Sequence, residues 1–226
     1  EYAVEQALLV KESLGDDTGD TVVTVLCVGP EQATDAVRKA LQMGADRGVH
    51  VVDEAIAGSD ALATSLVLAE AIKKIPHDLV VCGMASTDGS MGVVPAMLAE
   101  RLGVPGVTLG SEISVEGETV RIRRDGDAST DTVEGSLPLV LSVTDQSGEA
   151  RYPSFKGIMA AKKKPVETWS LADLGVDAGQ VGLSAAWSVV EGTTARPPRT
   201  AGEIVTDEDG SGAQALVDFL ASKKFI

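Results

Sequence analysis

The sequence is poor in aromatic residues, in cysteine and in positive charge. Phe, Trp and Tyr make up only 3% of the 226 residues although 44% are hydrophobic, so Ala, Val and Leu must fill the interior, as in closely packed α/β layers. Nineteen Lys and Arg against 34 Asp and Glu leave a net charge of −15, which would repel nucleic-acid phosphates and an anionic membrane. We expect no nucleic-acid partner and no membrane insertion, since apolar runs also stay well below the roughly 18 residues of a membrane span.

The few cysteines and histidines stand in no pattern typical of a metal or catalytic site. Cys27 and Cys82 lie in apolar runs without a CxxC motif, which predicts two small core residues. His50 and His77 have no evident Ser, Cys or metal-ligand partner, so we expect both at the surface. We predict no metal site and no catalytic residue.

Strand and helix patterns alternate through the first hundred residues, which predicts an α/β fold with a mostly parallel sheet. The predicted strands cover residues 21–28, 49–52 and 79–82, and the predicted helices cover residues 2–11, 33–43, 60–74 and 93–102. The first helix has no capping residue before it and the chain starts with Glu1 rather than Met. We therefore expect an N-terminal segment ahead of residue 1.

Beyond Pro105 the pattern changes to paired strands and then to an arm. Strands are predicted over residues 110–115, 119–124, 131–134 and 139–143, with a hairpin turn at residues 116–118. From Leu171 onward apolar residues are too few for a separate core, except that residues 213–225 return to helical spacing. We divide the chain into an α/β domain over residues 1–165 and an arm over residues 166–226.

A glycine-rich turn at residues 83–92 leads from a predicted strand into a predicted helix. Such a turn offers free backbone N–H groups and a positive helix end, which favours phosphate binding. Ser86, Thr87 and Ser90 add hydroxyls, and Asp88 could accept from a ribose. An ordinary βα turn explains these residues equally well, because no GxxxxGK[ST], GxGxxG or Ser-Gly-Gly loop is present.

A loop at residues 149–164 is basic although the protein is acidic. Residues 151–170 hold five basic groups and one acid, a net charge of +4. Phe155, Ile158 and Met159 beside Arg151 have the composition of an interface hot spot, and Pro153 favours exposure. We favour an interface over the alternative, a core-facing loop. The acids at Asp125 and Asp127, among three arginines, are interpreted as solvated ion pairs.

These motifs together resemble the beta subunit of electron transfer flavoprotein. Residues 33–50, ATDAVRKALQMGADRGVH, look like the family's A-L-A-M-G-A-D-R-G-I-H segment. Further similarities over the C-terminal half are LP at 137–138, RYPS at 151–154, KKK at 162–164, DLGVD at 173–177 and RTAG at 199–202. The resemblance covers essentially the whole chain.

The resemblance implies a Rossmann-like fold of the adenine nucleotide alpha hydrolase type, with a strand ahead of residue 1, a β-hairpin extension and a long C-terminal arm that packs on an alpha subunit. It implies a heterodimer in which the alpha subunit holds most of the FAD, and a structural AMP in this chain. Electrons would come from acyl-CoA dehydrogenases and related dehydrogenases and pass to the electron transfer flavoprotein quinone oxidoreductase. The location would be cytoplasmic in a bacterium, or the mitochondrial matrix in a eukaryote.

The resemblance also assigns residues by position. The implied nucleotide contacts are Val28, Gly83, Met84, Ala85, Ser86, Thr87, Asp88, Gly89, Ser90, Met91, Gly92, Val93 and Val94. The implied docking residues for dehydrogenases are Arg151, Tyr152, Phe155, Ile158 and Met159, with Phe155 where the family presents a Leu anchor. Asp125 stands where relatives have an acid that steers domain orientation.

Three alternatives stay open at this point. The turn reads STDGS at 86–90 where many relatives carry Ala-Ile-Asp-Asp-Asp, and electron-bifurcating members hold a second FAD in place of AMP. The Gly-Asp-Thr-Ala-Gln pattern of those members is missing, which favours AMP. The other two alternatives are a stand-alone adenine-nucleotide-binding protein and a purely structural subunit with an empty nucleotide pocket.

Overall fold

The computed structural model describes residues 1–15, 20–199, 202, 204–207 and 210–226. It divides into two compact units, residues 1–189 and residues 190–226. Thr200 and Ala201 of the predicted arm motif lie outside the described residues.

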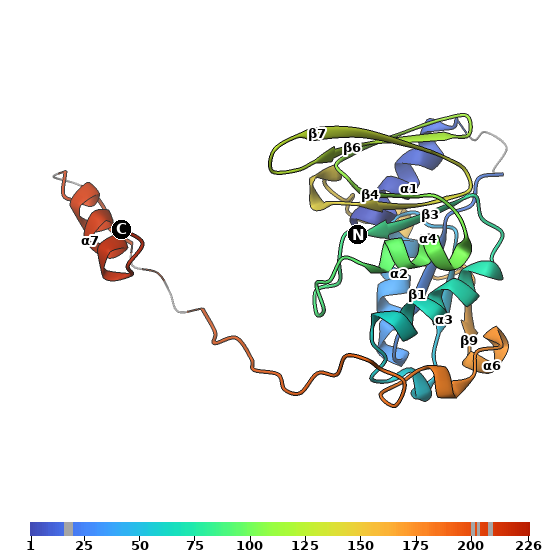
Figure 1. Cartoon of the computed structure of the whole chain (residues 1–226). Helices are drawn as coiled ribbons and strands as arrows, with labels where there is room; N and C mark the ends of the chain where they lie inside the picture. The colour runs from blue at the N-terminus through green and yellow to red at the C-terminus, as the bar shows by residue number, and fades with distance from the viewer. Residues whose placement is uncertain (16–19, 200–201, 203, 208–209) are drawn as a thin grey trace. The chain divides into compact units, whose positions relative to one another are not determined.

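Two three-stranded parallel sheets form the centre of the first unit (Figure 1). One has the order β1 (Thr24–Val28), β2 (Arg47–Val51), β9 (Val166–Trp169), and the other β3 (Leu79–Gly83), β8 (Leu139–Val143), β4 (Gly106–Gly110). All pairings within both sheets are parallel, so each pair of neighbouring strands is joined by a long connection and not by a tight hairpin. The predicted mostly parallel α/β fold is confirmed.

Helices cover both faces of these sheets. Val51 of β2 packs against α3, whereas Gly48, three residues earlier, lies against Val37 of α2, so α2 and α3 cover opposite faces. The helices of the first unit are α1 (Tyr2–Ser13), α2 (Thr34–Met43), α3 (Ala61–Lys73), α4 (Val94–Leu102), α5 (Phe155–Ala161) and α6 (Leu171–Leu174). Short 3-10 turns are η1 (Glu31–Ala33), η2 (Glu54–Ile56), η3 (Asp145–Ser147) and η4 (Ala178–Gln180).

An antiparallel sheet of three strands forms the hairpin extension. Its strands are β5 (Glu112–Glu116), β6 (Thr119–Asp125) and β7 (Thr130–Ser136). Gly117 takes the left-handed conformation, φ +58°, that the predicted turn requires. Val120 and Ile122 are buried against Leu141 and Val143, which attaches this sheet to the parallel core.

Two strands, β4 and β9, are not predicted by the sequence. Strand β4 begins at Gly106, directly after a proline, and ends at Gly110, and both glycines resemble loop residues. Its pairing with buried β8 makes it a strand, because tertiary contacts override weak local preference. The predicted strand at 110–115 is in fact the end of β4 followed by β5.

The first unit extends further along the chain than predicted. Strand β9 pairs with β2, and Leu171, Leu174, Val176 and Val181 are buried in the cluster that contains Val51. These residues need no core of their own because they complete the core of the preceding domain. The expected boundary after residue 165 therefore lies inside the first unit.

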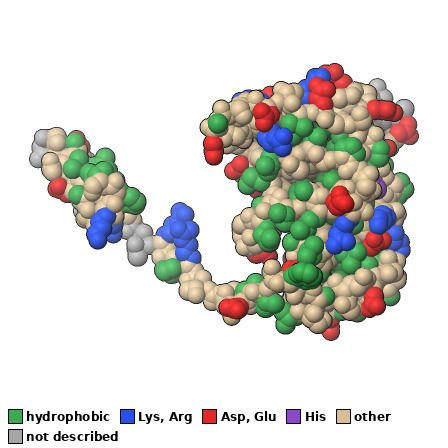
Figure 2. Space-filling model, viewed as in Figure 1, with side chains coloured by type: hydrophobic (Ala, Val, Ile, Leu, Met, Phe, Trp, Pro, Cys, Tyr) green, Lys and Arg blue, Asp and Glu red, His purple; other side chains and the backbone are tan. Residues whose placement is uncertain are grey.

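The second unit contains the predicted C-terminal helix, α7 (Gly212–Ser222). None of its residues is buried, and Leu216, Val217 and Phe219 are exposed; hydrophobic side chains are visible at the surface of this unit (Figure 2). Packing of the arm on an alpha subunit stays a prediction. No helix among the described residues has the length and apolarity needed to cross a membrane.

The predicted surface position of His50 is wrong. His50 is only 3% exposed, because it lies on β2 with a strand on each side, and its Nε2 has no hydrogen-bond partner among the described residues. His77 is half-buried, with its Nδ1 2.7 Å from the Ile75 carbonyl. Cys27 and Cys82 are free and pack against apolar clusters, as predicted, and burial raises the pKa of Cys82 to about 11.

Candidate functional site

The glycine-rich turn leaves the carboxyl end of β3 and leads into α4. Residues 83–92 are all exposed, and a Cβ added at Gly83 would meet no atom within 4 Å. Gly92 and Ser90 have positive φ values of +65° and +51°, which bend the backbone tightly before the helix. No side chain caps the start of α4, so the N–H groups of its first turn, other than at Pro95, which has none, are not taken by a capping side chain.

Asp88 is held by the turn itself. Hydrogen bonds from the Ser86 side chain and from the Gly89 N–H, 2.6 Å from Oδ1, keep the pKa of Asp88 below its ordinary value. Ser90 Oγ donates to the Ser86 carbonyl at 3.2 Å. The Asp88 carboxylate therefore stabilises the turn, and its predicted contact with a ribose stays a prediction.

Val28 lies at the carboxyl end of β1, the position equivalent to that of the turn on β3. Leu26 of β1 and Val80 of β3 pack against the same apolar cluster, which places the two strands in one core. Carboxyl ends of parallel strands are where α/β folds bind ligands. A ligand shared by Val28 and the turn stays a prediction.

The predicted docking residues after Arg151 expose their apolar side chains. Tyr152 is 95% exposed and Phe155 81%, and Ile158 and Met159 are exposed on α5. Only Ala161 of α5 is buried. We call residues 152–159 the docking segment.

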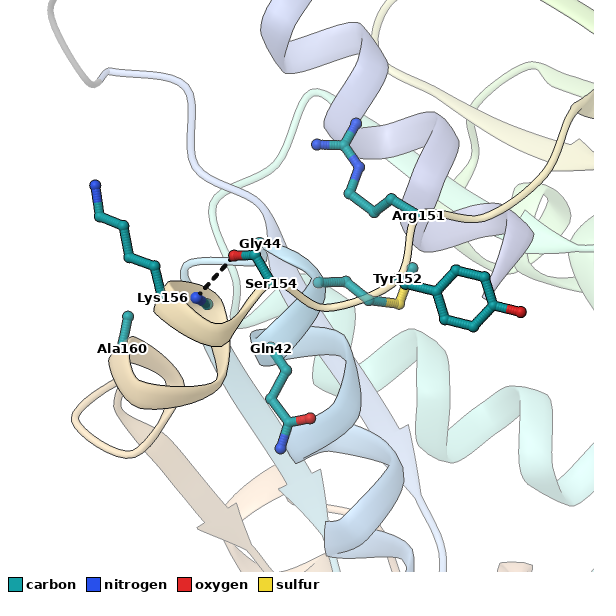
Figure 3. Close-up of a pocket in the computed structure, with 9 residues that line it drawn as sticks. Gln42, Gly44, Arg151, Tyr152, Ser154, Lys156 and Ala160 are labelled. Carbon is teal, nitrogen blue, oxygen red and sulfur yellow. Dashed lines mark hydrogen bonds between the residues drawn. The ribbon is translucent and has the colours of Figure 1, made fainter.

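Arg151 has a different environment from the rest of the docking residues. Its Nε and Nη2 donate to the two carboxylate oxygens of Glu5 at 2.8 and 2.9 Å, and its Nη1 donates to Glu12 at 2.5 Å. Its side chain extends toward α1 (Figure 3). These bonds lower the pKa of Glu5 and of Glu12 and raise that of Arg151. The sequence does not reveal the two glutamates, which look like ordinary helix-surface acids.

A pocket of about 420 Å³ lies beside the docking segment (Figure 3). The C-terminal end of α2, with Gln42, Met43 and Gly44, forms one wall, and residues between Arg151 and Ala160 form the other. Ser154 Oγ accepts from the Gly157 N–H at 3.0 Å, which caps α5.

The basic run at residues 162–164 is only partly available to a partner. Lys162 and Lys163 are exposed, but Lys164 Nζ donates to the carbonyls of Leu41, Gly44 and Ala45 at 2.6–3.1 Å and so caps the C-terminal end of α2. Arg38 of α2 in turn donates to the Ala161 and Lys164 carbonyls, both at 3.2 Å. Two of the five basic groups counted toward an interface, Arg151 and Lys164, are therefore engaged in hydrogen bonds within this chain.

Asp125 at the end of β6 is fully engaged within the hairpin extension. It accepts from Ser111 Oγ at 2.6 Å and Thr130 Oγ1 at 2.9 Å and forms an ion pair with Arg123 at 3.0 Å. These contacts lower its pKa, the Ser111 hydrogen bond most. The interpretation of Asp125 as part of a surface ion pair is confirmed; a role in domain orientation stays a prediction.

Fold and site together define a Rossmann-like α/β protein with an exposed glycine-rich turn at residues 83–92 and exposed apolar side chains at residues 152–159. The sequence matches the electron transfer flavoprotein domain family over residues 1–174. It is 47% identical to an electron transfer flavoprotein subunit beta of Mycobacterium tuberculosis, over all of this chain and 85% of that protein, and 48% identical to that of Mycobacterium leprae over the same shares. It is 33% identical to the caffeyl-CoA reductase-Etf complex subunit CarD of Acetobacterium woodii, over 98% of this chain and 82% of CarD.

The chain therefore belongs to the family of electron transfer flavoprotein beta subunits. Members of this family are electron carrier subunits of flavoproteins, and the designation beta implies a partner alpha subunit. The predicted family and its Rossmann-like fold are confirmed.

Proposed function

We propose that this chain, paired with an alpha subunit that holds most of the FAD, carries electrons from acyl-CoA and related dehydrogenases to a membrane quinone oxidoreductase. In a bacterium this takes place in the cytoplasm. The FAD supplies the redox chemistry when it is bound, and this chain supplies docking and part of the cleft without a catalytic residue of its own. The observation that carries the proposal is the exposure of Tyr152 and Phe155 on a segment whose two ends are fixed.

An electron carrier must bind each partner briefly. Such complexes have small interfaces, and their affinity comes from a few aromatic anchors. Phe155 and Tyr152 present aromatic surface at the start of α5, and Ile158 and Met159 widen it by one helical turn. The geometry fits a compact contact that forms and dissociates quickly.

Phe155→Ala in the purified heterodimer tests this function. Loss of a central aromatic anchor should raise the KM for the carrier in reduction by an acyl-CoA dehydrogenase about tenfold or more. Leu62→Ala, which truncates an exposed apolar side chain on α3, is the control and should leave KM unchanged. An unchanged KM for Phe155→Ala with every dehydrogenase tried would contradict the docking role.

We further propose that the turn at residues 83–94 binds AMP as a structural ligand. Its exposed backbone and the uncapped start of α4 suit a phosphate, and the Ser and Thr hydroxyls add donors. The open space at Gly83 leaves room for a ligand against the backbone.

A second candidate is an electron-bifurcating subunit with a second FAD in place of AMP. The similarity to a subunit of a caffeyl-CoA reductase-Etf complex favours keeping this candidate. Release of bound small molecules by denaturing the heterodimer separates the two: one FAD and one AMP per heterodimer supports the simple carrier, and two FAD supports bifurcation. Absence of any nucleotide other than the alpha subunit's FAD would contradict both.

A further inference from the structure

The docking segment has almost no apolar packing of its own to fix its conformation. Only Ala161 at the end of α5 is buried, while Tyr152 and Phe155 extend into solvent. A short helix of seven residues is not stable by itself in water. Contacts outside the segment must therefore hold it in place.

The end after the docking segment is fixed by α2. Arg38 and Lys164 cap each other's helices through backbone carbonyls, as described above. Gly157 packs so closely on α2 that an added Cβ would lie 2.5 Å from the Gln42 carbonyl oxygen. These contacts set the position of α5 but do not reach Tyr152.

The end before the docking segment is fixed by α1. Glu5 accepts from the Arg151 backbone N–H at 3.0 Å as well as from its guanidinium, so both the main chain and the side chain of Arg151 are held. Gln6 Nε2 donates to the Ser147 carbonyl at 2.6 Å, four residues earlier in the same loop. The Glu5 side chain is 8% exposed and that of Glu12 is 56% exposed, so the inner pair is the better shielded one.

We propose that Arg151 is a positioning residue, and that the cluster of Glu5, Arg151 and Glu12 holds the docking segment in the conformation that a partner dehydrogenase binds. The inference deepens the proposed docking function and rests on it. It removes Arg151 from the surface that touches the partner and adds two glutamates of α1 to the residues on which docking depends.

The hydrogen-bond capacity of Arg151 supports this role over direct contact. A guanidinium has five N–H donors. The Nε, Nη1 and Nη2 atoms make four hydrogen bonds to the two glutamates, so one donor is left for any other group. Bidentate bonds between Arg and carboxylates are also the most directional ion pairs, which suits a device that sets orientation.

The mechanism is preorganisation. A segment that is already ordered loses less conformational entropy on binding, so its affinity is higher than that of the same residues in a mobile loop. Weakening the cluster should therefore raise KM without changing the electron-transfer step itself.

The test compares variants of the complete heterodimer with an acyl-CoA dehydrogenase. Arg151→Met removes all side-chain hydrogen bonds of the cluster. Arg151→Lys keeps the charge but loses the bidentate geometry. Glu12→Gln weakens only the exposed pair between Arg151 and Glu12. The control is Arg121→Met, which removes the 2.7 Å ion pair with Glu134 on the hairpin extension. The readouts are KM, kcat, flavin content and hydrogen exchange over residues 149–161.

We expect Arg151→Met to raise KM about tenfold and to speed exchange over residues 149–161, with kcat and flavin content unchanged. Arg151→Lys should raise KM less than Arg151→Met does, and Glu12→Gln should raise KM about two- to threefold. Arg121→Met should change neither KM nor the exchange over residues 149–161. If Arg151→Met fails to assemble, Glu12→Gln tests the positioning role in its place, because a side chain that is 56% exposed contributes little to folding.

Two results would overturn the inference. Faster exchange with an unchanged KM would show that the order of the segment does not matter for docking, and a raised KM with unchanged exchange would make Arg151 a direct contact. Phe155→Ala is measured beside these variants. If Phe155→Ala also leaves KM unchanged, the docking function fails; if it raises KM while the cluster variants do not, only the positioning role fails.

Discussion

Two exposed segments of the first unit differ in what they present to a ligand and in how they are held. The turn at residues 83–92 offers mainly backbone, and its stability comes from local contacts such as that between Asp88 and Gly89. The docking segment offers side chains and is held by residues far away in the sequence, Glu5 and Gln42 among them. A segment that binds through its side chains needs contacts with the rest of the fold to hold those side chains in position. A turn that binds through backbone N–H groups needs unoccupied space next to its backbone.

The largest effect is expected from a methyl group at Gly157. Its Cβ would lie 2.5 Å from the Gln42 carbonyl oxygen, which cannot move without distorting α2. Gly157→Ala should destabilise the chain by about 1–3 kcal/mol, as overpacking does, and should weaken docking because α5 is displaced. Chemical denaturation of the heterodimer and the KM for a dehydrogenase measure the two effects. Unchanged values for both would show that α5 does not depend on close contact with α2.

The matching substitution in the turn should separate stability from binding. Gly83→Ala meets no atom within 4 Å, so the free energy of unfolding should change by less than about 1 kcal/mol. The added methyl narrows the space beside the proposed phosphate site, and we expect less AMP per purified heterodimer. The measurement is nucleotide content after denaturation. Full retention of AMP would mean that the ligand does not approach Gly83.

The ion cluster predicts a pH dependence that the turn does not share. Arg151 lowers the pKa of Glu5 and Glu12 from the ordinary value of 4.5, so both are ionised over a wider range when the protein is folded. Their contribution to stability is complete above pH 4.5 and is lost as pH falls through the lowered values. The protection of amides over residues 149–161, measured against their intrinsic exchange rate at the same pH, should therefore fall below pH 4.5, and less steeply in Glu12→Gln. Equal pH profiles in the variant and the parent would contradict this prediction.

The smallest effect is expected from Phe155→Leu, which restores the anchor that the family resemblance implies at this position. Both side chains are apolar, and the exposed position imposes no packing limit on either. We expect KM to change by less than about threefold, with the direction depending on the dehydrogenase, since one anchor is larger than the other. KM values for two different dehydrogenases measure it. A loss as large as that of Phe155→Ala would mean that the aromatic ring itself is recognised.

Local sequence predicts the features that depend on neighbouring residues. The alternation of strands and helices up to α4 follows from hydrophobic periodicity, and the hairpin turn at Gly117 follows from the need for positive φ. The glycine-rich turn is recognisable because glycines and hydroxyl residues stand between a strand and a helix. Strand β4 is not recognisable from the sequence, because Gly106 and Gly110 have no strand preference of their own.

The candidate site is only partly predictable for the same reason. Residue type places Tyr152 and Phe155 at an interface, and both are exposed. Residue type also groups Arg151 with them, although its partners Glu5 and Glu12 lie 146 and 139 residues earlier. The prediction of a surface position for His50 is wrong because nothing near it in the sequence marks it as the centre of a sheet.

The sequence by itself determined the family, the order of the elements up to α4 and the chemical character of both exposed segments, since these depend on residue types and short-range spacing. The tertiary structure decided which charges are free and which are structural, and where the first unit ends. Arg151 and Lys164 form hydrogen bonds to residues more than a hundred positions away, and Val181 completes a core begun by Val51. Burial and pairing of this kind depend on distances in space, and only the folded chain sets those distances.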